Sequence, residues 1–211
     1  MERGKFIVLE GIDGAGTTTQ AQLLRSWLQD IHGKRVLLTQ EPSSLPTGNM
    51  ISSMLKRRIV APHGQGDPNV DPRAVALLFA SDRLYHLQEE IMPAIAQGYW
   101  VISDRYLASS LAYQSIYCDM DWVAEINKFA DSPDLSFYLN LSAEIAMKRI
   151  GTRANKDHFE RLDLLTRVSE NYRAIREDMD FVSIDANLDV QTIAGIIQET
   201  IASVCGLATD S

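Results

Sequence analysis

The sequence predicts a three-layer α/β fold in which helices cover both faces of a doubly wound, five-stranded parallel sheet. Five short apolar segments alternate with helical segments along the chain, as expected for strands joined by right-handed crossovers. The first of these segments, residues 6–9, is continuously apolar, which is typical of a strand buried on both faces. A glycine-rich loop follows it directly, and ligands of such folds bind at the carboxyl ends of the strands.

The amino-terminal third contains this first strand, a helix, a second strand and a short helix. Residues 18–31 carry apolar side chains at a helical spacing, and Gly33 is a typical residue just beyond a helix end. Residues 35–39 are expected to form the second strand and residues 51–55 the short helix. Residues 61–71, which contain Pro and Gly, are expected to form a loop.

The middle of the chain begins with a clear helix start. Asp71 followed by Pro72 predicts an N-cap and a proline at the first helical position. This helix is expected to run to about Ala96 and to bend near Pro93, because proline lacks the N–H that a helix interior needs. The third strand and the two helices after it are expected over residues 100–103, 107–117 and 122–130.

The carboxyl-terminal part continues the same alternation. Residues 135–141 are expected to form the fourth strand, and Ser142 to cap the helix that follows. A charged segment, residues 151–161, precedes a long helix that reaches about Asp178. The fifth strand, the last helix and a frayed tail are expected over residues 181–184, over residues 190–204 and from residue 206.

Composition limits the classes of protein to which the chain can belong. Its 211 residues suit one domain, residues 1–211, and we find no repeat or linker that would divide it. The net charge of −8 argues against a nucleic-acid surface, and no stretch has the 18 or so apolar residues of a membrane span. Two cysteines are too few for a disulfide framework. We therefore expect a cytoplasmic protein with reduced thiols.

The loop after the first strand has the spacing of a phosphate-binding loop, G-x-x-x-x-G-K-[ST], with Thr17 at the lysine position. Its backbone N–H groups would form an anion nest at a helix N-terminus, and the Thr18 hydroxyl would hold Mg²⁺. The alternative is a glycine-rich turn that binds no ligand. The residues expected to bind ATP are Gly11, Asp13, Gly14, Ala15, Gly16, Thr17, Thr18 and Thr19.

Five motifs, in order along nearly the whole chain, resemble those of thymidylate kinases. They are residues 6–16 (F-x-x-x-E-G-x-D-G), 39–42 (T-R-E-P, with Gln40 for arginine), 78–83 (L-F-x-A-x-R), 104–114 (D-R-Y-x-x-S-x-x-A-Y-Q) and 157–160 (D-R-F-E, with His158 for arginine). The resemblance implies the nucleotide-kinase type of phosphate-loop NTPase fold. It also implies two small-molecule substrates, ATP and dTMP, with Mg²⁺ as cofactor, and a homodimer.

Phe79 and Arg83 are the residues that the resemblance assigns to the thymine base. They are four residues apart and would share one face of a helix. Phe79 would stack on the base and Arg83 would donate to a thymine carbonyl. The alternative is a core phenylalanine beside a solvated arginine.

Asp104 and Arg105 come directly after the third strand, at the edge of the sheet where ligands bind. Arg105 would hold the dTMP phosphate, since a guanidinium offers phosphate oxygens a two-pronged fork. Asp104 would bind Mg²⁺ or orient the attacking phosphate, and its structural alternative is an ion pair with Arg105.

The other substrate-side residues rest on the resemblance. Asp13 would contact the 3′-hydroxyl of the deoxyribose, or else stabilise a turn. Tyr113 would disfavour a 2′-hydroxyl. The remaining residues expected to line the substrate pocket are Glu41, Pro42, Ser109, Ser110 and Gln114.

A lid segment at about residues 148–161 carries the cations that could offset the missing lysine. We expect Arg153 to reach the phosphates as a catalytic arginine, assisted by Arg149, which is four residues earlier and could share a helix face with it. The alternative is a solvated charged surface. The other cations of the segment are Lys148, Lys156 and Arg161.

These observations predict a dTMP kinase that transfers the γ-phosphate of ATP to dTMP, giving dTDP and ADP. Thr17, Gln40 and His158 stand where the family usually has cations, so one alternative is a catalytically impaired, regulatory nucleotide-binding relative. A second is a kinase for another deoxynucleoside monophosphate. The full set of substrate-side motifs favours an active dTMP kinase.

Overall fold

The computed structural model describes residues 3–55, 70–151 and 156–207, of which residues 156–160 are described by their backbone alone. Five parallel strands form one sheet in the order β2-β3-β1-β4-β5, which confirms the predicted sheet. The strands are β1 (Phe6–Gly11), β2 (Val36–Gln40), β3 (Trp100–Asp104), β4 (Leu135–Asn140) and β5 (Phe181–Asp185).

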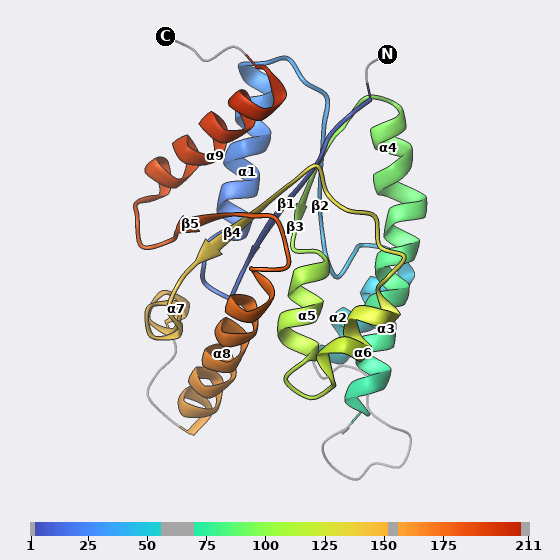
Figure 1. The fold of residues 1–211 in the computed structure, drawn as a ribbon, viewed down its shortest axis with the longest axis vertical. Helices are drawn as coiled ribbons and strands as arrows, with labels where there is room; N and C mark the ends of the chain where they lie inside the picture. The colour runs from blue at the N-terminus through green and yellow to red at the C-terminus, as the bar shows by residue number, and fades with distance from the viewer. Residues whose placement is uncertain (1–2, 56–69, 152–155, 208–211) are drawn as a thin grey trace.

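Helices cover both faces of this sheet (Figure 1). On one face α1 packs against β1, β2 and β3 and contacts α9, which lies on β5. On the other face α4 packs against β3 and α5 against β1, while α8 packs on α5. The helices are α1 (Thr17–Asp30), α2 (Pro46–Leu55), α3 (Pro72–His86), α4 (Met92–Ala96), α5 (Leu107–Gln114), α6 (Met120–Ile126), α7 (Ala143–Ile150), α8 (Lys156–Ile175) and α9 (Val190–Cys205).

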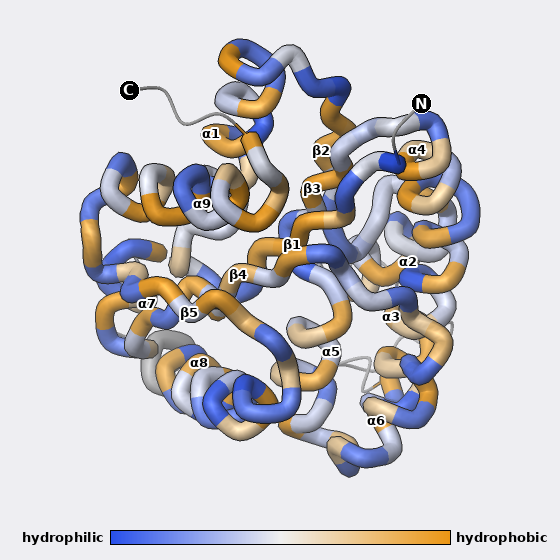
Figure 2. Tube along the Cα trace, turned by 45° about the horizontal axis from the view of Figure 1, so that its top comes forward, coloured by the Kyte–Doolittle hydropathy of each residue, from blue (hydrophilic) through white to orange (hydrophobic). Residues whose placement is uncertain are grey.

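Strand β1 lies at the centre of the sheet and is buried along its whole length. Its side chains alternate between the two helical layers, as the period of a strand requires. Phe6 and Val8 pack in a cluster with Ile91 and Ile95, whereas Ile7 and Leu9 belong to the larger cluster that contains the helix α1 leucines. Figure 2 accordingly shows the hydrophobic residues concentrated in the central strands. Because β1 is fixed from both sides, the loop at its carboxyl end starts from a rigid position.

Two predicted helix caps are confirmed. The Asp71 side chain accepts a hydrogen bond from Arg73 N, with Pro72 at the first helical position. Ser142 Oγ accepts from Ile145 N at the start of α7. Both interactions are local in sequence, which is why the sequence alone predicts them.

Several predicted boundaries differ from the structure. The helix expected over residues 72–96 is divided by a π-helical turn, Leu87–Ile91, so the irregularity precedes Pro93. Helix α2 begins at Pro46, earlier than expected, and α6 ends at Ile126, also earlier than expected.

The end of α7 at Ile150 corrects the expectation that one helix carries both Arg149 and Arg153. Here Gly151 adopts φ 73°, a left-handed conformation that glycine tolerates and that ends the helix. Most of the loop expected over residues 61–71 and the end of the tail lie outside the described residues.

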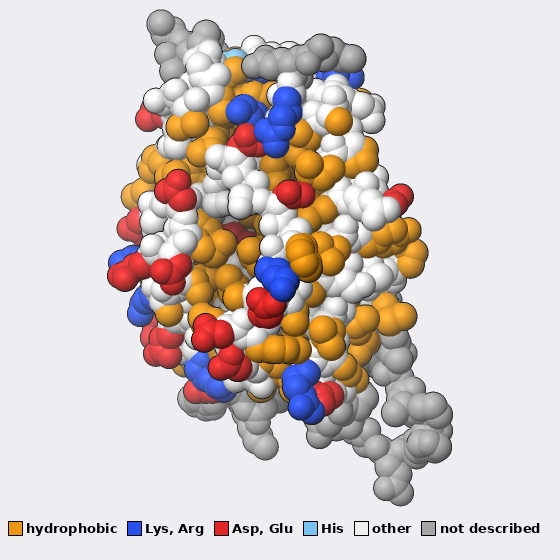
Figure 3. All heavy atoms as spheres, turned by 45° about the vertical axis from the view of Figure 1, so that its right-hand side comes forward, with side chains coloured by type: hydrophobic (Ala, Val, Ile, Leu, Met, Phe, Trp, Pro, Cys, Tyr) orange, Lys and Arg blue, Asp and Glu red, His pale blue; other side chains and the backbone are white. Residues whose placement is uncertain are grey.

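One side of the molecule keeps an apolar stripe at its surface. Leu77, Leu84, Tyr85 and Met92 follow one another at helical spacing from α3 to α4, and all four side chains are exposed. Figure 3 shows hydrophobic side chains gathered on this side of the molecule. Within the described ranges, no helix combines the length and the apolarity needed to cross a membrane.

Two helical glycines give a prediction about stability. A Cβ at Gly48 would lie 2.1 Å from the backbone oxygen of Ser43, which cannot easily yield because Asp82 holds both its N–H and its hydroxyl. Gly48→Ala should therefore lower the free energy of unfolding by about 3 kcal/mol. The matched control is Gly195→Ala in α9, where a Cβ meets no described atom within 4 Å. This substitution should raise the free energy of unfolding by about 0.5–1 kcal/mol. Urea unfolding of both variants tests this, and equal midpoints would contradict it.

Candidate active site

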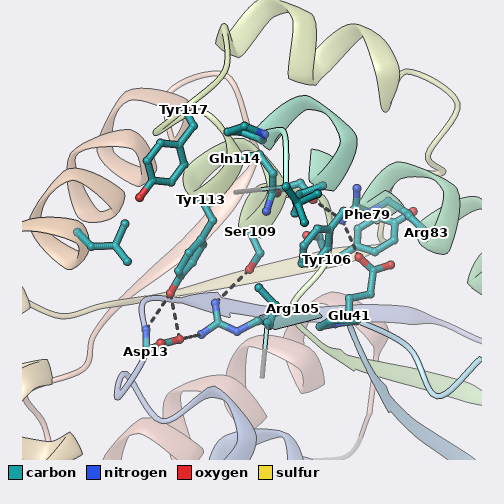
Figure 4. A pocket seen from close by; sticks show the side chains of 17 residues that line it. Asp13, Glu41, Phe79, Arg83, Arg105, Tyr106, Ser109, Tyr113, Gln114 and Tyr117 are labelled. Atoms are coloured by element: carbon teal, nitrogen blue, oxygen red, sulfur yellow. Dashed lines mark hydrogen bonds and ion pairs between the residues drawn. The ribbon is translucent and has the colours of Figure 1, made fainter. Parts of the chain in front are cut away.

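Two of the cavities at the carboxyl ends of the strands contain most of the predicted site residues. The first has a volume of about 500 Å³, within the range of small-molecule sites. All ten residues predicted on the substrate side line it: Asp13, Glu41, Pro42, Phe79, Arg83, Arg105, Ser109, Ser110, Tyr113 and Gln114. Figure 4 shows the side chains that line this cavity, with Asp13 and Arg105 at one end and Phe79 and Arg83 toward the other.

The second cavity follows the glycine-rich loop. It is lined by residues 13–20 and by residues 187–190, which lead from β5 into α9, together with Arg105, Arg149 and Ile193. Gly14 and Gly16 have φ values of 84° and 99°, which glycine adopts without strain, and Gly16 is the N-cap of α1. This is the backbone geometry that an anion nest at a helix start requires. Gly11 lies behind the loop at the end of β1, where its carbonyl accepts a hydrogen bond from Arg105.

Asp13 and Arg105 line both cavities and mark the point at which these meet. Arg105 Nη2 donates to Asp13 Oδ1 at 2.9 Å, and Tyr113 Oη donates to the same oxygen at 3.1 Å. The partner carboxylate of Arg105 is therefore Asp13, so the alternative in which Asp104 pairs with Arg105 is wrong. Although burial lowers the pKa of Arg105, the neighbouring phenol and carboxyl groups of Tyr113, Tyr172, Asp13 and Glu10 outweigh this effect and raise it, so the guanidinium stays charged.

Arg105 has an unusual backbone conformation. Its φ is 74°, and within the described ranges it is the one residue other than glycine with a positive φ. Such a conformation costs about 1–3 kcal/mol and persists where the surroundings determine it. Here Arg105 N donates to Leu9 O at 2.9 Å, and Ser103 Oγ donates to Arg105 O at 2.7 Å. The conformation turns the side chain from the end of β3 toward the glycine-rich loop.

Glu10 organises the turn that carries Arg105. Its Oε1 accepts from Tyr106 N at 2.8 Å and from Ser109 N at 3.2 Å, two groups at the start of α5. Its Oε2 accepts from Ser109 Oγ at 2.6 Å and from Tyr172 Oη at 2.9 Å. The side chain of Tyr106, the N-cap of α5, makes no capping bond, so a carboxylate from β1 caps this helix. Burial raises the pKa of Glu10 above its ordinary value, against the opposing effect of these hydrogen bonds and of Arg105.

Arg83 lies at the opposite end of the first cavity and is almost fully buried. Its Nη2 donates to Glu41 Oε2 at 2.6 Å and to Ser110 Oγ at 2.8 Å, and its Nη1 donates to Asn127. Its Nε has no hydrogen-bond partner in the described part of the chain. The alternative of a solvated arginine is therefore wrong, because this side chain is held rigidly in the cavity wall.

Thr18 and Asp104, the two predicted metal ligands, lie next to each other. Thr18 Oγ1 donates to Asp104 Oδ2, while Asp104 Oδ1 is buried and has no hydrogen-bond partner among the residues that the structure describes. Hydroxyl and carboxylate oxygens are the ligands that Mg²⁺ prefers, with phosphate oxygens and water completing its shell. Among the described residues no group of three or more His, Cys, Asp or Glu side chains could hold a metal alone. The residues present thus fit a nucleotide-bound Mg²⁺.

Arg149 lies beside the glycine-rich loop, where its Nη1 is 3.4 Å from Gly14 O and its Nη2 donates to Ala186 O at 2.7 Å. Arg153 lies outside the described residues, so its expected contact with the phosphates stays a prediction. Arg161 on α8 reaches Asp13, with 3.6 Å between Nη2 and Oδ2. Arg161 was predicted only as one of the cations of the lid, with no role of its own.

Glu10 and Tyr172 also shape the site, although neither was predicted to do so. A signal for Glu10 was present, since a carboxylate directly after an apolar strand is costly to bury unless it accepts hydrogen bonds. Tyr172 gave no such signal, because a tyrosine within a long amphipathic helix reads as core. Burial raises the pKa of Tyr172 well above its ordinary value and that of Tyr113 to about 12, so both phenols are neutral donors at pH 7.

Comparisons with known proteins agree with this geometry. The profile of the family described as thymidylate kinase matches residues 9–197. A probable thymidylate kinase of Thermococcus kodakarensis is 40% identical over 208 residues, covering 95% of this chain and 98% of the relative. A probable thymidylate kinase of Pyrococcus horikoshii is 43% identical over 178 residues, covering 83% and 84%. A thymidylate kinase of Prochlorococcus marinus is 36% identical over 205 residues, covering 92% of each chain. Identity of this extent, together with paired cavities that meet at Asp13 and Arg105, shows that the chain is a phosphotransferase of the thymidylate kinase family.

Proposed function

We propose that this chain transfers the γ-phosphoryl group of ATP to dTMP, giving dTDP and ADP. The observation that carries the proposal is the meeting of two different cavities at Asp13 and Arg105. One cavity is largely apolar with a rigid arginine in its wall, which suits a pyrimidine base. The other has a glycine-rich loop at a helix start, which suits phosphates. Phosphoryl transfer needs donor and acceptor to meet in line, and this junction is where they would meet.

On the acceptor side, each residue has a role that follows from its chemistry. Phe79 would stack on thymine, and Arg83 would donate to a base carbonyl from its fixed position. Asp13 would accept from the 3′-hydroxyl and Tyr113 would exclude a 2′-hydroxyl. Arg105 would hold the 5′-phosphate. The residues that would complete the walls around base and sugar are Glu41, Pro42, Ser109, Ser110 and Gln114.

On the donor side, the backbone N–H groups from Asp13 to Thr19 would hold the ATP phosphates. Thr18 and Asp104 would bind Mg²⁺, which when present neutralises charge on the phosphate oxygens. Arg149 would contact the nucleotide from the far side of the loop. We also infer that residues 148–161 act as a lid, from which Arg153 reaches the phosphates.

A steady-state assay of ADP release tests this function. With ATP and Mg²⁺, dTMP should give the highest kcat/KM among dTMP, dUMP, dCMP and thymidine, and thymidine should give no turnover because it offers Arg105 no phosphate. Omission of Mg²⁺ should abolish turnover. A higher kcat/KM with dUMP or dCMP would contradict the substrate assignment, and inactivity with all four would indicate the impaired relative.

We further infer a homodimer that buries the apolar stripe of Leu77, Leu84, Tyr85 and Met92. An exposed apolar patch is typical of an interaction surface, and a two-fold axis would let the stripe pack on its own copy. Sedimentation equilibrium tests this, and a monomer at all micromolar concentrations would contradict it. A cytoplasmic location is inferred from the use of ATP and from the two free cysteines, Cys118 and Cys205.

A further inference from the structure

The last residue of α3, His86, is a fully buried titratable side chain that has no part in the site described so far. It is not among the residues that line the first cavity. Both of its ring nitrogens nevertheless lie within 3.5 Å of a carboxylate oxygen. A side chain buried only for packing would not need such partners, since an apolar side chain fills the same space at a lower cost.

Three side chains surround the imidazole ring of His86. Its Nδ1 is 3.5 Å from Glu41 Oε1. Its Nε2 is 2.8 Å from Thr39 Oγ1 on β2 and 3.3 Å from Glu90 Oε2 in the π-helical turn. A carboxylate only accepts hydrogen bonds, so the contact with Glu41 places a hydrogen on Nδ1. In the neutral ring Nε2 then accepts from the Thr39 hydroxyl, and in the charged ring it donates, so Nδ1 faces Glu41 as a donor in both states.

Glu41 connects His86 to the wall of the first cavity. Its side chain is 3% exposed, and its two oxygens face different partners. Oε2 accepts from Arg83 Nη2 at 2.6 Å, whereas Oε1 faces His86. A buried carboxylate needs a donor at each oxygen. Without the imidazole, this carboxylate would turn toward other donors and would move Arg83 with it.

Arg83 is the residue whose orientation depends on this arrangement. Its Nη groups donate to Glu41, Ser110 and Asn127, so the guanidinium is held by fixed acceptors. The same side chain lines the first cavity, and its Nε makes no hydrogen bond to the residues that the structure describes. A donor forms a good hydrogen bond with a carbonyl oxygen only over a limited range of angles. A small rotation of the guanidinium would therefore weaken its contact with a base.

We propose that His86 is a positioning residue for dTMP binding: it holds Glu41 Oε1, and Glu41 in turn orients Arg83 toward the thymine base. The inference rests on the proposed function, since it concerns the acceptor site of the same reaction. His86 itself is fully buried, so it acts on the nucleotide only through these two side chains. Arg83 lies at the end of the cavity away from Arg105, where the phosphate would bind (Figure 4). A contact so far from the transferred phosphoryl group acts equally on the ground state and the transition state, so its loss should raise KM for dTMP and leave kcat nearly unchanged.

Two amide variants separate this role from packing. His86→Asn places an amide nitrogen where Nδ1 lies and so keeps a donor for Glu41. The matched control, His86→Gln, places its amide where Nε2 lies and so keeps only the contacts with Thr39 and Glu90. We expect KM for dTMP to rise about tenfold in His86→Gln and to stay within about threefold in His86→Asn, since a hydrogen bond to a charged group is lost only in the first. In both variants kcat and KM for ATP should stay within about twofold of the unmodified chain. A KM for dTMP that is no higher in His86→Gln than in His86→Asn would overturn the inference.

A substrate fragment provides a second measurement. The compound 2-deoxyribose 5-phosphate has the sugar and the phosphate of dTMP but no base, so it cannot use Arg83. Its inhibition constant against dTMP should therefore be the same in the unmodified chain and in both His86 variants. If this constant rose in His86→Gln as much as KM for dTMP does, His86 would shape the whole cavity, and its action through Arg83 would be excluded.

The unmodified chain separates this inference from the proposed function. Turnover of dTMP by the unmodified chain, together with equal KM values for dTMP in the two variants, would overturn only the role of His86. Absence of turnover in the unmodified chain would overturn the proposed function and the inference with it.

Discussion

Replacement of Arg105 by methionine is expected to lower kcat/KM for dTMP by about three orders of magnitude, or about 4 kcal/mol of transition-state stabilisation. The guanidinium lies where the two cavities meet, and its fork can hold phosphate oxygens in a fixed orientation. Methionine fills a similar volume but offers no donor. It also removes the guanidinium that lies 2.9 Å from Asp13 Oδ1, so the Asp13 carboxylate keeps only its longer ion pair with Arg161 and would repel the incoming phosphate more strongly.

Two further variants show whether the fork or the charge matters. Arg105→Lys keeps the charge but cannot hold Gly11 O, Asp13 and a phosphate at once, so kcat/KM should still fall about 10–100-fold. Arg25→Met, which removes an exposed arginine of α1, should leave kcat/KM unchanged. Equal kinetics of Arg105→Met and Arg25→Met would exclude Arg105 from the site.

Replacement of Glu10 by alanine should lower both stability and activity, although Glu10 lines neither cavity. The change removes the acceptor of four donors, including the buried N–H group of Tyr106 and the partly buried N–H group of Ser109. Breaking a buried polar network of this kind costs about 3–5 kcal/mol of unfolding free energy. Arg105 would also lose the turn that maintains its positive φ, so kcat/KM should fall with it.

Urea unfolding and steady-state kinetics of the same preparations test this. Tyr172→Phe serves as the matched control, because it removes only one of the four donors and should cost about 1 kcal/mol. A Glu10→Ala variant no less stable than Tyr172→Phe would show that the carboxylate does not organise the turn.

The pH dependence of stability provides an independent test of Glu10. Burial raises its pKa in the folded chain above the ordinary value of 4.5, so the folded state binds the proton more tightly than the unfolded state. The stability of the unmodified chain relative to Glu10→Gln, which cannot titrate, should therefore be greatest below about pH 4.5. It should then decrease as the pH rises toward the folded-state pKa. If the relative stability increased with pH instead, the hydrogen bonds would lower the pKa of Glu10 by more than burial raises it.

Sequence patterns were sufficient for the features that depend on neighbouring residues. The five strands were predicted because each is an apolar run between turn residues, and the structure confirms all five with shifts of one or two residues at their ends. The caps at Asp71 and Ser142 were predicted because a cap bonds to an N–H two or three residues away. The substrate-side residues were predicted because they occur in short ordered motifs, and they do line one cavity.

Helix ends were harder to predict, because packing decides them as well as local sequence. Nothing in the apolar pattern indicated the π-helical turn at residues 87–91, within a helical segment that otherwise continues to Ala96. The end of α7 at Ile150 likewise separates Arg149 from Arg153, which a continuous helix would have placed on one face.

By itself, the sequence determined that this protein is an α/β nucleotide kinase with an altered phosphate loop, since that information lies in local patterns and ordered motifs. Only the tertiary structure decided what holds the site together. Glu10 meets Tyr172 across 162 positions of the chain, and Arg161 reaches Asp13 although the two residues are far apart in sequence. Such contacts depend on how helices pack over a sheet and on the direction of each side chain. The residue pattern of a single segment predicts neither the packing nor the direction of a side chain.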